Sequence, residues 1–202
     1  MSEFERWEGR FAAQDYVFGK EPNAFLKAQA SLLRAGESAL ALADGEGRNG
    51  VWLAEQGLVV TAVDFSPAAQ KKARKLAQER GVSIDTQIAD LVDWNWPESR
   101  FDVVAAIFIQ FCGPDERERI FEGIRRTLKP GGLLLMEGYR PEQLAYKTGG
   151  PSRVENLYTA ELLRRHFGDW RIVTLQAHDS VITEGAGHGG MSALIDLVAH
   201  KP

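Results

Sequence analysis

The chain has 202 residues, of which 44% are hydrophobic, and a formal net charge of −4. That length suits one well-filled domain and is short for two. The acidic balance argues against a nonspecific nucleic-acid binder and against a protein of anionic membrane surfaces, because both partners demand a positive surface. We therefore expect a single domain that binds neither nucleic acid nor membrane.

Cysteine and histidine usage narrows the class further. The single cysteine, Cys112, excludes an internal disulfide framework, and the four histidines are scattered without the spacing of a zinc site. The first residues lack the charged start and apolar core of a signal peptide, and no apolar run approaches membrane-spanning length. We expect a cytoplasmic protein without a bound metal.

The N-terminal stretch leaves two interpretations open. Residues 4–20 mix aromatic and charged side chains without a clear period. The aromatic residues could pack on the domain as an arm, or Tyr16 and its neighbours up to Gly19 could close over a ligand. Pro22 then favours the start of a helix, whose apolar stripe continues until Gly36 ends it. We expect residues 1–36 to cover a ligand site built by the residues that follow.

A glycine-rich stretch follows, and the rest of the chain is organised around it. An apolar run begins at Ala39, residues 44–50 read Asp-Gly-Glu-Gly-Arg-Asn-Gly, and a helical pattern comes next. This order predicts a buried parallel strand, a tight loop and a helix, which is half of a nucleotide-binding βαβ unit. A second apolar run ends in Asp64, where a carboxylate can accept hydrogen bonds from both ribose hydroxyls. The chain is therefore expected to bind an adenosine-containing cofactor.

The charge of the loop indicates which kind of cofactor. Gly45, Gly47 and Gly50 fit G-x-G-x-x-G, a pattern that is weak evidence by itself. A pyrophosphate would be attracted to the helix N-terminus but repelled by the loop carboxylates of Asp44 and Glu46. An acidic loop suits a ligand that carries an amine or a sulfonium.

Two further strands bring side chains to the same edge of the sheet. Ser66 and Pro67 predict the start of a helix that runs to Arg80, followed by a strand over residues 82–88. Asp90, just beyond that strand, either contacts the exocyclic amine of an adenine or caps a loop. Residues 101–109 are the most apolar run and the expected central strand.

The C-terminal third departs from the layout of a dehydrogenase. The turn at residues 129–132 leads into a strand over residues 133–138, and the long polar segment 139–157 is expected to form a substrate-side loop. A helix at 159–167 precedes two strand-like runs, 170–178 and 191–200. Because no helix separates these last two runs, they must pair antiparallel.

Taken in this order, the features resemble the class I S-adenosylmethionine-dependent methyltransferases. The resemblance covers nearly the whole chain, and residues 18–23 and 47–49 further resemble the branch with tellurite-resistance and thiopurine-type small-molecule enzymes. It implies one Rossmann-like α/β domain over residues 1–202, with a mostly parallel seven-stranded sheet, helices on both faces and an antiparallel C-terminal hairpin. One departure is the usual acidic residue at the end of strand one, where this chain has Ala41.

The resemblance also implies which residues bind S-adenosylmethionine. Because the usual acidic residue is missing, we expect Asp44 or Glu46 to hold the amine of the methionine moiety. The expected cofactor-binding residues are Tyr16, Ala43, Asp44, Gly45, Glu46, Gly47, Asn49, Asp64, Phe65, Ser66, Asp90, Leu91 and Phe108.

Methyl transfer from a sulfonium is a single in-line displacement, so the protein must mainly align donor and acceptor and exclude water. A thiolate or reduced chalcogen needs little help from a base, whereas an oxygen or amine must lose a proton. The candidate catalytic residues are His188, Glu137 and Tyr146. For His188, which is flanked by glycines, a surface position on a flexible hairpin is an equally open interpretation.

The leading hypothesis is a small-molecule methyltransferase. An NAD-dependent oxidoreductase rests only on the glycine spacing, and a noncatalytic S-adenosylmethionine-binding module would keep the cofactor site without an acceptor pocket. An RNA or protein methyltransferase is disfavoured by the acidic chain and by the lack of an added domain. The sequence fixes neither the methyl acceptor nor the oligomeric state.

Overall fold

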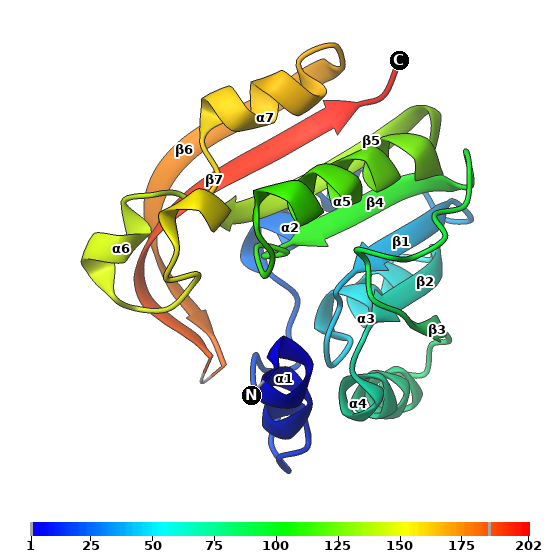
Figure 1. Ribbon diagram of the computed structural model, residues 1–202. Helices are drawn as coiled ribbons and strands as arrows, with labels where there is room; N and C mark the ends of the chain where they lie inside the picture. Colours follow the sequence, from blue (N-terminus) through cyan, green and yellow to red (C-terminus); the bar gives the residue numbers. More distant parts are fainter. Residues whose placement is uncertain (1, 186) are drawn as a thin grey trace.

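The computed structural model describes residues 2–185 and 187–202, without the side chain of His188. In these residues one seven-stranded sheet has the order β3-β2-β1-β4-β5-β7-β6 (Figure 1). The first five strands run parallel, and β7 lies antiparallel between β5 and β6. The strands are β1 Ser38–Leu42, β2 Val59–Asp64, β3 Asp85–Ile88, β4 Phe101–Ile107, β5 Leu128–Tyr139, β6 Arg171–Glu184 and β7 His188–His200. The expected fold class is confirmed.

Helices cover both faces of this sheet. The α-helices are α1 Glu3–Phe11, α2 Ala24–Ala28, α3 Arg48–Glu55, α4 Pro67–Glu79, α5 Pro114–Thr127, α6 Gln143–Tyr146 and α7 Ala160–Phe167, and η1 Ala30–Leu32 and η2 Val154–Asn156 are 3-10 turns. One core layer packs α5 and α7 on the sheet through Phe121 and Phe167. The layer on the opposite face packs α2 and α3 through Leu26 and Leu53. None of the helices described is long and apolar enough to cross a membrane.

The N-terminal region differs from the expectation. Residues 3–11 form α1, which a capping box starts: the Ser2 hydroxyl accepts from the Glu5 amide, and the Glu5 carboxylate accepts from the Ser2 amide. The helix expected from Pro22 is replaced by the short α2, which Asn23 caps, and by η1. The sequence Ser-x-x-Glu at residues 2–5 is the signal that would have predicted α1.

The C-terminal hairpin is longer than expected. Most of residues 183–190, expected as a loop, pair as strand up to the register Glu184↔His188. The long tip reaches the N-terminal arm, where the Gly187 amide donates to the Val17 carbonyl at 2.9 Å. Figure 1 shows the hairpin curving down beside the segment that follows α1. Two segments from opposite ends of the chain are therefore in contact.

The segment 139–157 is more ordered than a plain loop. It contains α6 and η2, and Gln143 donates to Gly149 and Thr148 within it. Strand β5 also starts earlier than expected, at Leu128, so the residues of the expected turn at 129–132 belong to the strand.

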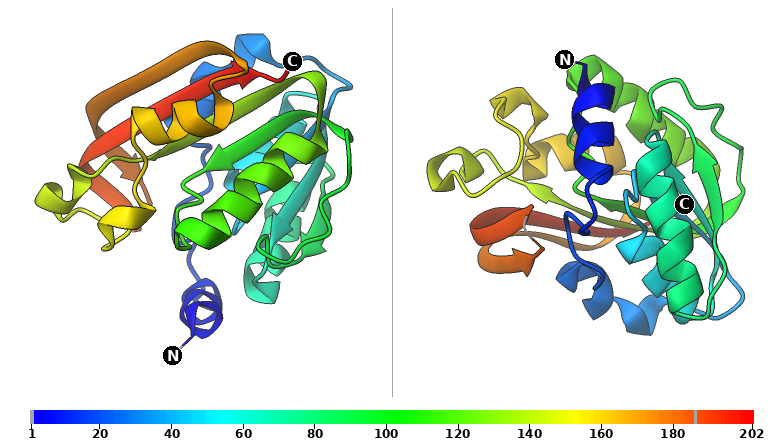
Figure 2. Two further views of the ribbon diagram at one scale, coloured as in Figure 1. Left: turned by 45° about the horizontal axis from the view of Figure 1, so that its top comes forward. Right: turned by 90° about the horizontal axis from the view of Figure 1, so that it is seen from below.

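The strand order reverses between β1 and β4. In open α/β sheets the crevice beyond the carboxyl ends of such strands is where ligands bind. Helix α1 stands apart from the sheet at this end and lies beside α4 (Figures 1 and 2). The fold thus brings the glycine-rich loop, Asp64 and α1 together.

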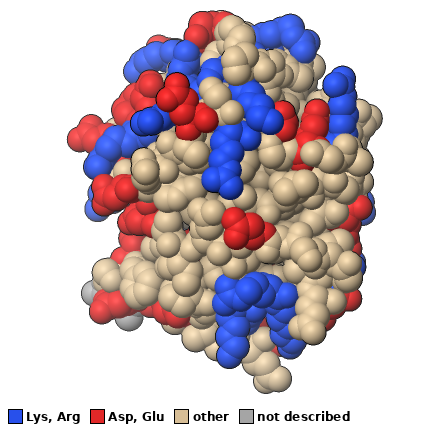
Figure 3. Space-filling model, turned by 90° about the vertical axis from the view of Figure 1, so that its right-hand side faces the viewer, with Lys and Arg blue, Asp and Glu red and all other residues tan. Residues whose placement is uncertain are grey.

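The surface shows no single dominant charge on the face that Figure 3 displays. Basic side chains gather at its lower end, in the region of α4, and acidic and basic side chains alternate near the top. Helix α4 carries the exposed Lys71, Arg74 and Lys75.

Candidate cofactor and acceptor site

Two residues next to the crevice have strained backbones. Ala43, just after β1, has a φ of 45°, and Phe108, just after β4, has a φ of 55°. This left-handed region is unfavourable for residues other than glycine, and such strain concentrates at ligand sites. The Phe108 amide donates to the Glu137 carbonyl at 2.8 Å, which holds that turn against β5. Both strands that border the crevice therefore end in fixed, sharply turned backbone.

Asp64 is held in one orientation by two backbone groups. Its Oδ2 accepts from the Gly45 amide and its Oδ1 from the Ser66 amide, both at 2.9 Å. The side chain is buried, and burial raises the pKa of Asp64 to about 6. Each carboxylate oxygen has a further lone pair, and together they can accept hydrogen bonds from the two hydroxyls of a ribose.

Asp44 occupies the start of the glycine-rich loop. Its carboxylate accepts from the Gly50 amide, at 3.0 and 3.1 Å to the two oxygens. A Cβ atom on Gly50 would overlap Oδ2 of Asp44, so glycine is required there for this contact. Burial raises the pKa of Asp44 to about 7, with a smaller contribution from the Asp64 charge. The ionised form of Asp44 therefore gains from a cation placed beside it.

Glu46 differs from Asp44 because protein groups engage both of its oxygens. Oε2 accepts from the Val17 amide and Oε1 from the Lys72 ammonium, each at 2.7 Å. Glu46 is buried, and it ties the N-terminal arm to α4. Tyr16 also faces α4, where its hydroxyl donates to the Lys72 carbonyl at 3.1 Å.

Helix α1 covers the start of α4 beside Asp64. The Glu8 carboxylate accepts from the Ser66 hydroxyl and from the Ala68 amide. The rings of Phe4 and Phe65 pack edge to face with centroids 5.7 Å apart. These contacts bring Phe65 and Ser66, two expected cofactor residues, under α1. No motif in the sequence singles out Glu8.

Asn23 connects the arm with three other elements. Its backbone N–H donates to Oδ1 of Asn49 at 3.0 Å. Its side-chain Nδ2 donates to Glu137 at 2.6 Å and to Glu184 at 3.1 Å. Its own Oδ1 caps α2 through the Leu26 amide. Asn23 is only 1% exposed, so this connection is shielded from water. It was missed because an asparagine after a proline signals only a turn.

Arg48, the first residue of α3, completes this group. Its Nη2 lies 2.7 Å from the Glu184 carboxylate, and both side chains are buried. Its Nη1 is buried with no hydrogen-bond partner in the described part of the chain. A buried guanidinium N–H of this kind would suit a carboxylate ligand.

Of the candidate catalytic residues, the Glu137 and Tyr146 side chains do not lie together. Glu137 is buried in β5, whereas Tyr146 lies exposed on α6 with its hydroxyl on Asp179 at 2.9 Å. The backbone of His188 pairs with Glu184, which contacts Asn23, but its side chain lies outside the described residues. Of the three, Glu137 has its contacts at the centre of the site.

Glu137 is an unusual carboxyl group. Burial, together with the smaller effects of the neighbouring Asp196 and Glu184 charges, raises the pKa of Glu137 to about 8. Asn23 opposes this shift through its hydrogen bond. At neutral pH the Glu137 carboxyl therefore holds its proton.

Asp90 and Leu91 form the turn after β3. Oδ1 of Asp90 accepts from the Val92 amide at 2.9 Å, so this exposed carboxylate caps its own turn. The Leu91 carbonyl accepts from the Trp96 indole at 3.2 Å. One carboxylate oxygen of Asp90 is thus used locally.

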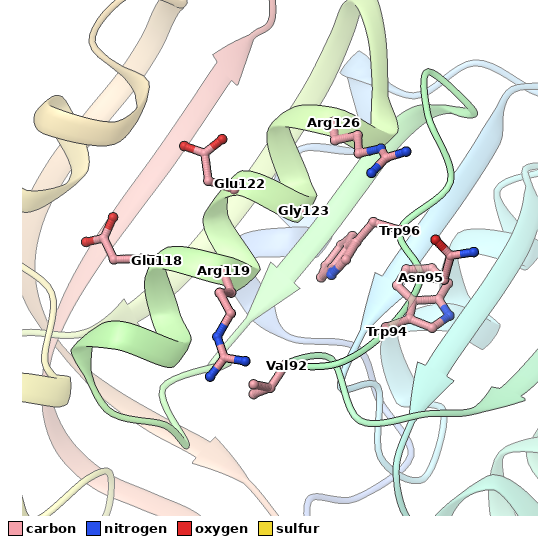
Figure 4. Close-up of a pocket in the computed structure, with 9 residues that line it drawn as sticks. All are labelled: Val92, Trp94, Asn95, Trp96, Glu118, Arg119, Glu122, Gly123 and Arg126. Carbon is pink, nitrogen blue, oxygen red and sulfur yellow. The ribbon is translucent and has the colours of Figure 1, made fainter.

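A surface hollow lies behind this turn, between the Trp94–Trp96 segment and α5 (Figure 4). It has a volume of about 430 Å³, and Arg119 and Arg126 border it. The Trp96 ring fits against Gly123, where a Cβ atom would overlap the indole. None of the expected site residues lines this hollow, so it is separate from the crevice.

Comparison with known proteins agrees with this geometry. Residues 39–132 match a protein family described as "Methyltransferase domain". An uncharacterized methyltransferase of Synechocystis is 30% identical over 127 residues, which are 62% of this chain and 58% of the relative. A demethylmenaquinone methyltransferase of Thermus thermophilus is 31% identical over 113 residues, 55% of this chain and 51% of the relative. The chain thus spans somewhat more than half the length of these relatives.

Solved structures extend the likeness to the whole chain at the level of the fold. A structure from work on the conversion of a disulfide bond into a thioacetal group during echinomycin biosynthesis superposes with a TM-score of 0.77 and 21% identity, covering 99% of this chain and 94% of that one. TehB from Haemophilus influenzae superposes with a TM-score of 0.73 and 15% identity, covering 98% of this chain and 67% of that one. Residues 39–132 thus match a methyltransferase domain, and the whole chain has the fold of these solved structures, as the resemblance to the class I S-adenosylmethionine-dependent methyltransferase superfamily implies.

The residues present fit the cofactor of this superfamily. S-adenosylmethionine carries a ribose diol, an ammonium, a carboxylate and a sulfonium. The structure offers the oriented carboxylate of Asp64, the carboxylate of Asp44 in an acidic loop, and the unpartnered Nη1 of Arg48. Ala41, at the place of the superfamily's usual acidic residue, is buried in β1.

Proposed function

We propose that this protein transfers the methyl group of S-adenosylmethionine to a small-molecule acceptor by in-line displacement. The observation that carries the proposal is the Asp64 carboxylate at the end of β2, fixed by the Gly45 and Ser66 amides beside the point where the strand order reverses. The match of residues 39–132 to a methyltransferase domain supports the reaction class. The demethylmenaquinone methyltransferase among the relatives supports a small acceptor.

Each cofactor group is assigned to a residue of this chain. Asp64 binds the ribose hydroxyls, Asp44 the ammonium and Arg48 the carboxylate. Asp44 is preferred to Glu46 because Val17 and Lys72 already engage both oxygens of Glu46. Asp90 and Leu91 are assigned to contact the adenine. Phe108 is assigned to lie near the methyl group of the cofactor.

The cofactor supplies an electrophilic methyl group, and the protein's part is to align the acceptor and keep water out. The arm and α1 exclude water, because Glu8 fastens α1 to the start of α4 and Asn23 fastens the arm to Asn49 of the glycine-rich loop. Glu137 is the preferred acid–base group, since it is buried within this site. His188 and Tyr146 stay candidates for substrate contacts.

Calorimetric titration with S-adenosylmethionine and NADH tests the cofactor assignment. We expect micromolar binding of S-adenosylmethionine and none of NADH. Asp64→Ala should weaken binding at least tenfold, because each lost charged hydrogen bond is worth about 1.5–3 kcal/mol. Asp85→Asn, an exposed carboxylate on the neighbouring β3, is the matched control and should bind as wild type. Binding that Asp64→Ala leaves unchanged would contradict the assignment.

A further inference from the structure

Three titratable side chains form a row on one face of the sheet. Glu137 of β5 lies opposite Asp196 of β7 in the strand register. Asp196 in turn lies opposite Gln176 of β6, and His178 follows two residues later. Because side chains two residues apart share a face of a strand, Glu137, Asp196 and His178 project to the same side.

Hydrogen bonds run along this row. Nε2 of His178 lies 3.0 Å from Oδ2 of Asp196, and Nδ1 lies 3.1 Å from the Ser180 hydroxyl. A carboxyl oxygen of Glu137, one of Asp196 and a ring nitrogen of His178 all lie within 4.8 Å of one another. The row leads from Glu137, which is 3% exposed, to the His178 side chain, which is 26% exposed on the edge strand β6. The row thus connects the buried site with the solvent-exposed edge of the sheet.

The charges around the row favour one stored proton. Two adjacent ionised carboxylates repel each other in a buried site, so a proton shared between them is favoured. The Arg48 guanidinium is paired with the Glu184 carboxylate, 2.7 Å away. The groups that face Glu137 are Asn23 from the arm, Arg48 from α3, Tyr139 from β5, Glu184 and His178 from β6, and Asp196 from β7.

The row is also connected to the glycine-rich loop. Asn23 donates its Nδ2 to Glu137 and its backbone N–H to Asn49 in the first turn of α3. Asn23 therefore bridges Glu137 and the start of α3, the element that would hold the methionine part of the cofactor. A positive charge placed there favours the ionised form of a nearby buried carboxyl.

We propose, resting on the proposed function, that Glu137, Asp196 and His178 form a proton-storing row that gives up its proton when the sulfonium cofactor binds. The proton on Glu137 passes to the Asp196 carboxylate, a proton passes from Asp196 to Nε2 of His178, and the ring returns one proton to solvent. Glu137 is left ionised, so it can stabilise the sulfonium or take the proton of an acceptor amine or hydroxyl. No other bond forms or breaks.

The matched ligands S-adenosylmethionine and S-adenosylhomocysteine test this proposal, because they differ in the methyl group and the sulfonium charge. Binding of each is measured calorimetrically at about pH 7.5 in two buffers of different ionisation enthalpy, which gives the number of protons released. We expect S-adenosylmethionine to release more protons than S-adenosylhomocysteine, with an excess approaching one per site. Glu137→Gln should abolish the excess, since the amide cannot ionise.

For the positioning residues Asp196 and His178, the pH dependence of the excess proton release is measured. Asp196→Asn and His178→Gln should shift the pH at which the excess release is largest, whereas His200→Gln, an exposed histidine of β7 outside the row, should not. Equal proton release for both ligands in the wild type would overturn the proposal and leave the proposed function standing. If neither ligand binds, the proposed function itself fails. The wild-type comparison decides the question even if a variant does not fold.

Discussion

At the scale of single residues, the site is built from carboxyl groups whose burial opposes their charge. Asp44, Asp64 and Glu137 all have raised pKa values, chiefly through burial. Burying these carboxyl groups lowers the stability of the unliganded protein, and a cationic ligand can interact with their ionised forms. The sign of the pH dependence follows from these shifts.

Asp44 makes this dependence testable. Its pKa is higher in the folded chain than in the unfolded one, so ionisation destabilises the fold as pH rises from about 4 through 7. Asp44→Asn should therefore raise the unfolding free energy at pH 8 by roughly 1–3 kcal/mol, with little change at pH 4. Denaturant unfolding of variant and wild type at the two pH values measures this.

The same substitution should weaken S-adenosylmethionine binding, because the amide offers the ammonium no charge. A variant that is stabilised at pH 8 yet binds the cofactor as tightly as wild type would remove Asp44 from the site.

At the scale of elements, α1 and the C-terminal hairpin close the site from two directions. Glu8 attaches α1 to the start of α4 through Ser66 and Ala68. Glu8→Ala should loosen α1 and speed the dissociation of S-adenosylmethionine several-fold, as followed by stopped-flow fluorescence. Glu3→Ala, which removes an exposed carboxylate of the same helix, is the control and should leave the rate unchanged. Equal rates for Glu8→Ala and wild type would mean that α1 does not cover the bound cofactor.

The hairpin tip gives a second prediction at this scale. A Cβ atom on Gly185 would lie 2.5 Å from the Gly19 amide nitrogen, and its φ of 66° disfavours other residues. Gly185→Ala should therefore lower the unfolding free energy by about 1–3 kcal/mol.

Gly189→Ala, where nothing lies within 4 Å of the added atom, is the matched control and should be nearly neutral. Thermal unfolding of the two variants compares them. Similar melting temperatures would show that the hairpin does not pack against the arm.

At the scale of the whole molecule, the sheet could be predicted because short patterns in the sequence mark each of its parallel strands. The apolar run before Gly45, the run ending in Asp64 and the Ser66–Pro67 helix start each carry their signal within a few residues. The antiparallel end followed from the absence of a helix between the last two strands.

The parts that could not be predicted depend on distant partners. Asn23 matters because Glu137 and Glu184 lie beside it, although they are 114 and 161 residues away in sequence. Glu46 and Asp44 are equivalent in the sequence pattern, and only the fold brings Val17 and Lys72 to the Glu46 carboxylate. The hairpin was predicted too short because its glycines suggested a loop, whereas pairing across β6 and β7 holds them in a strand.

Methyl transfer itself is the most direct test of the account. The protein is incubated with S-adenosylmethionine labelled in its methyl group and a panel of small amines, hydroxyl compounds and thiols, and product is followed by mass spectrometry. We expect label in an acceptor with one S-adenosylhomocysteine formed per methyl group, and a large loss of turnover in Asp64→Ala. Tight cofactor binding with no labelled product from any acceptor class would contradict the proposed enzyme and leave a noncatalytic binding module.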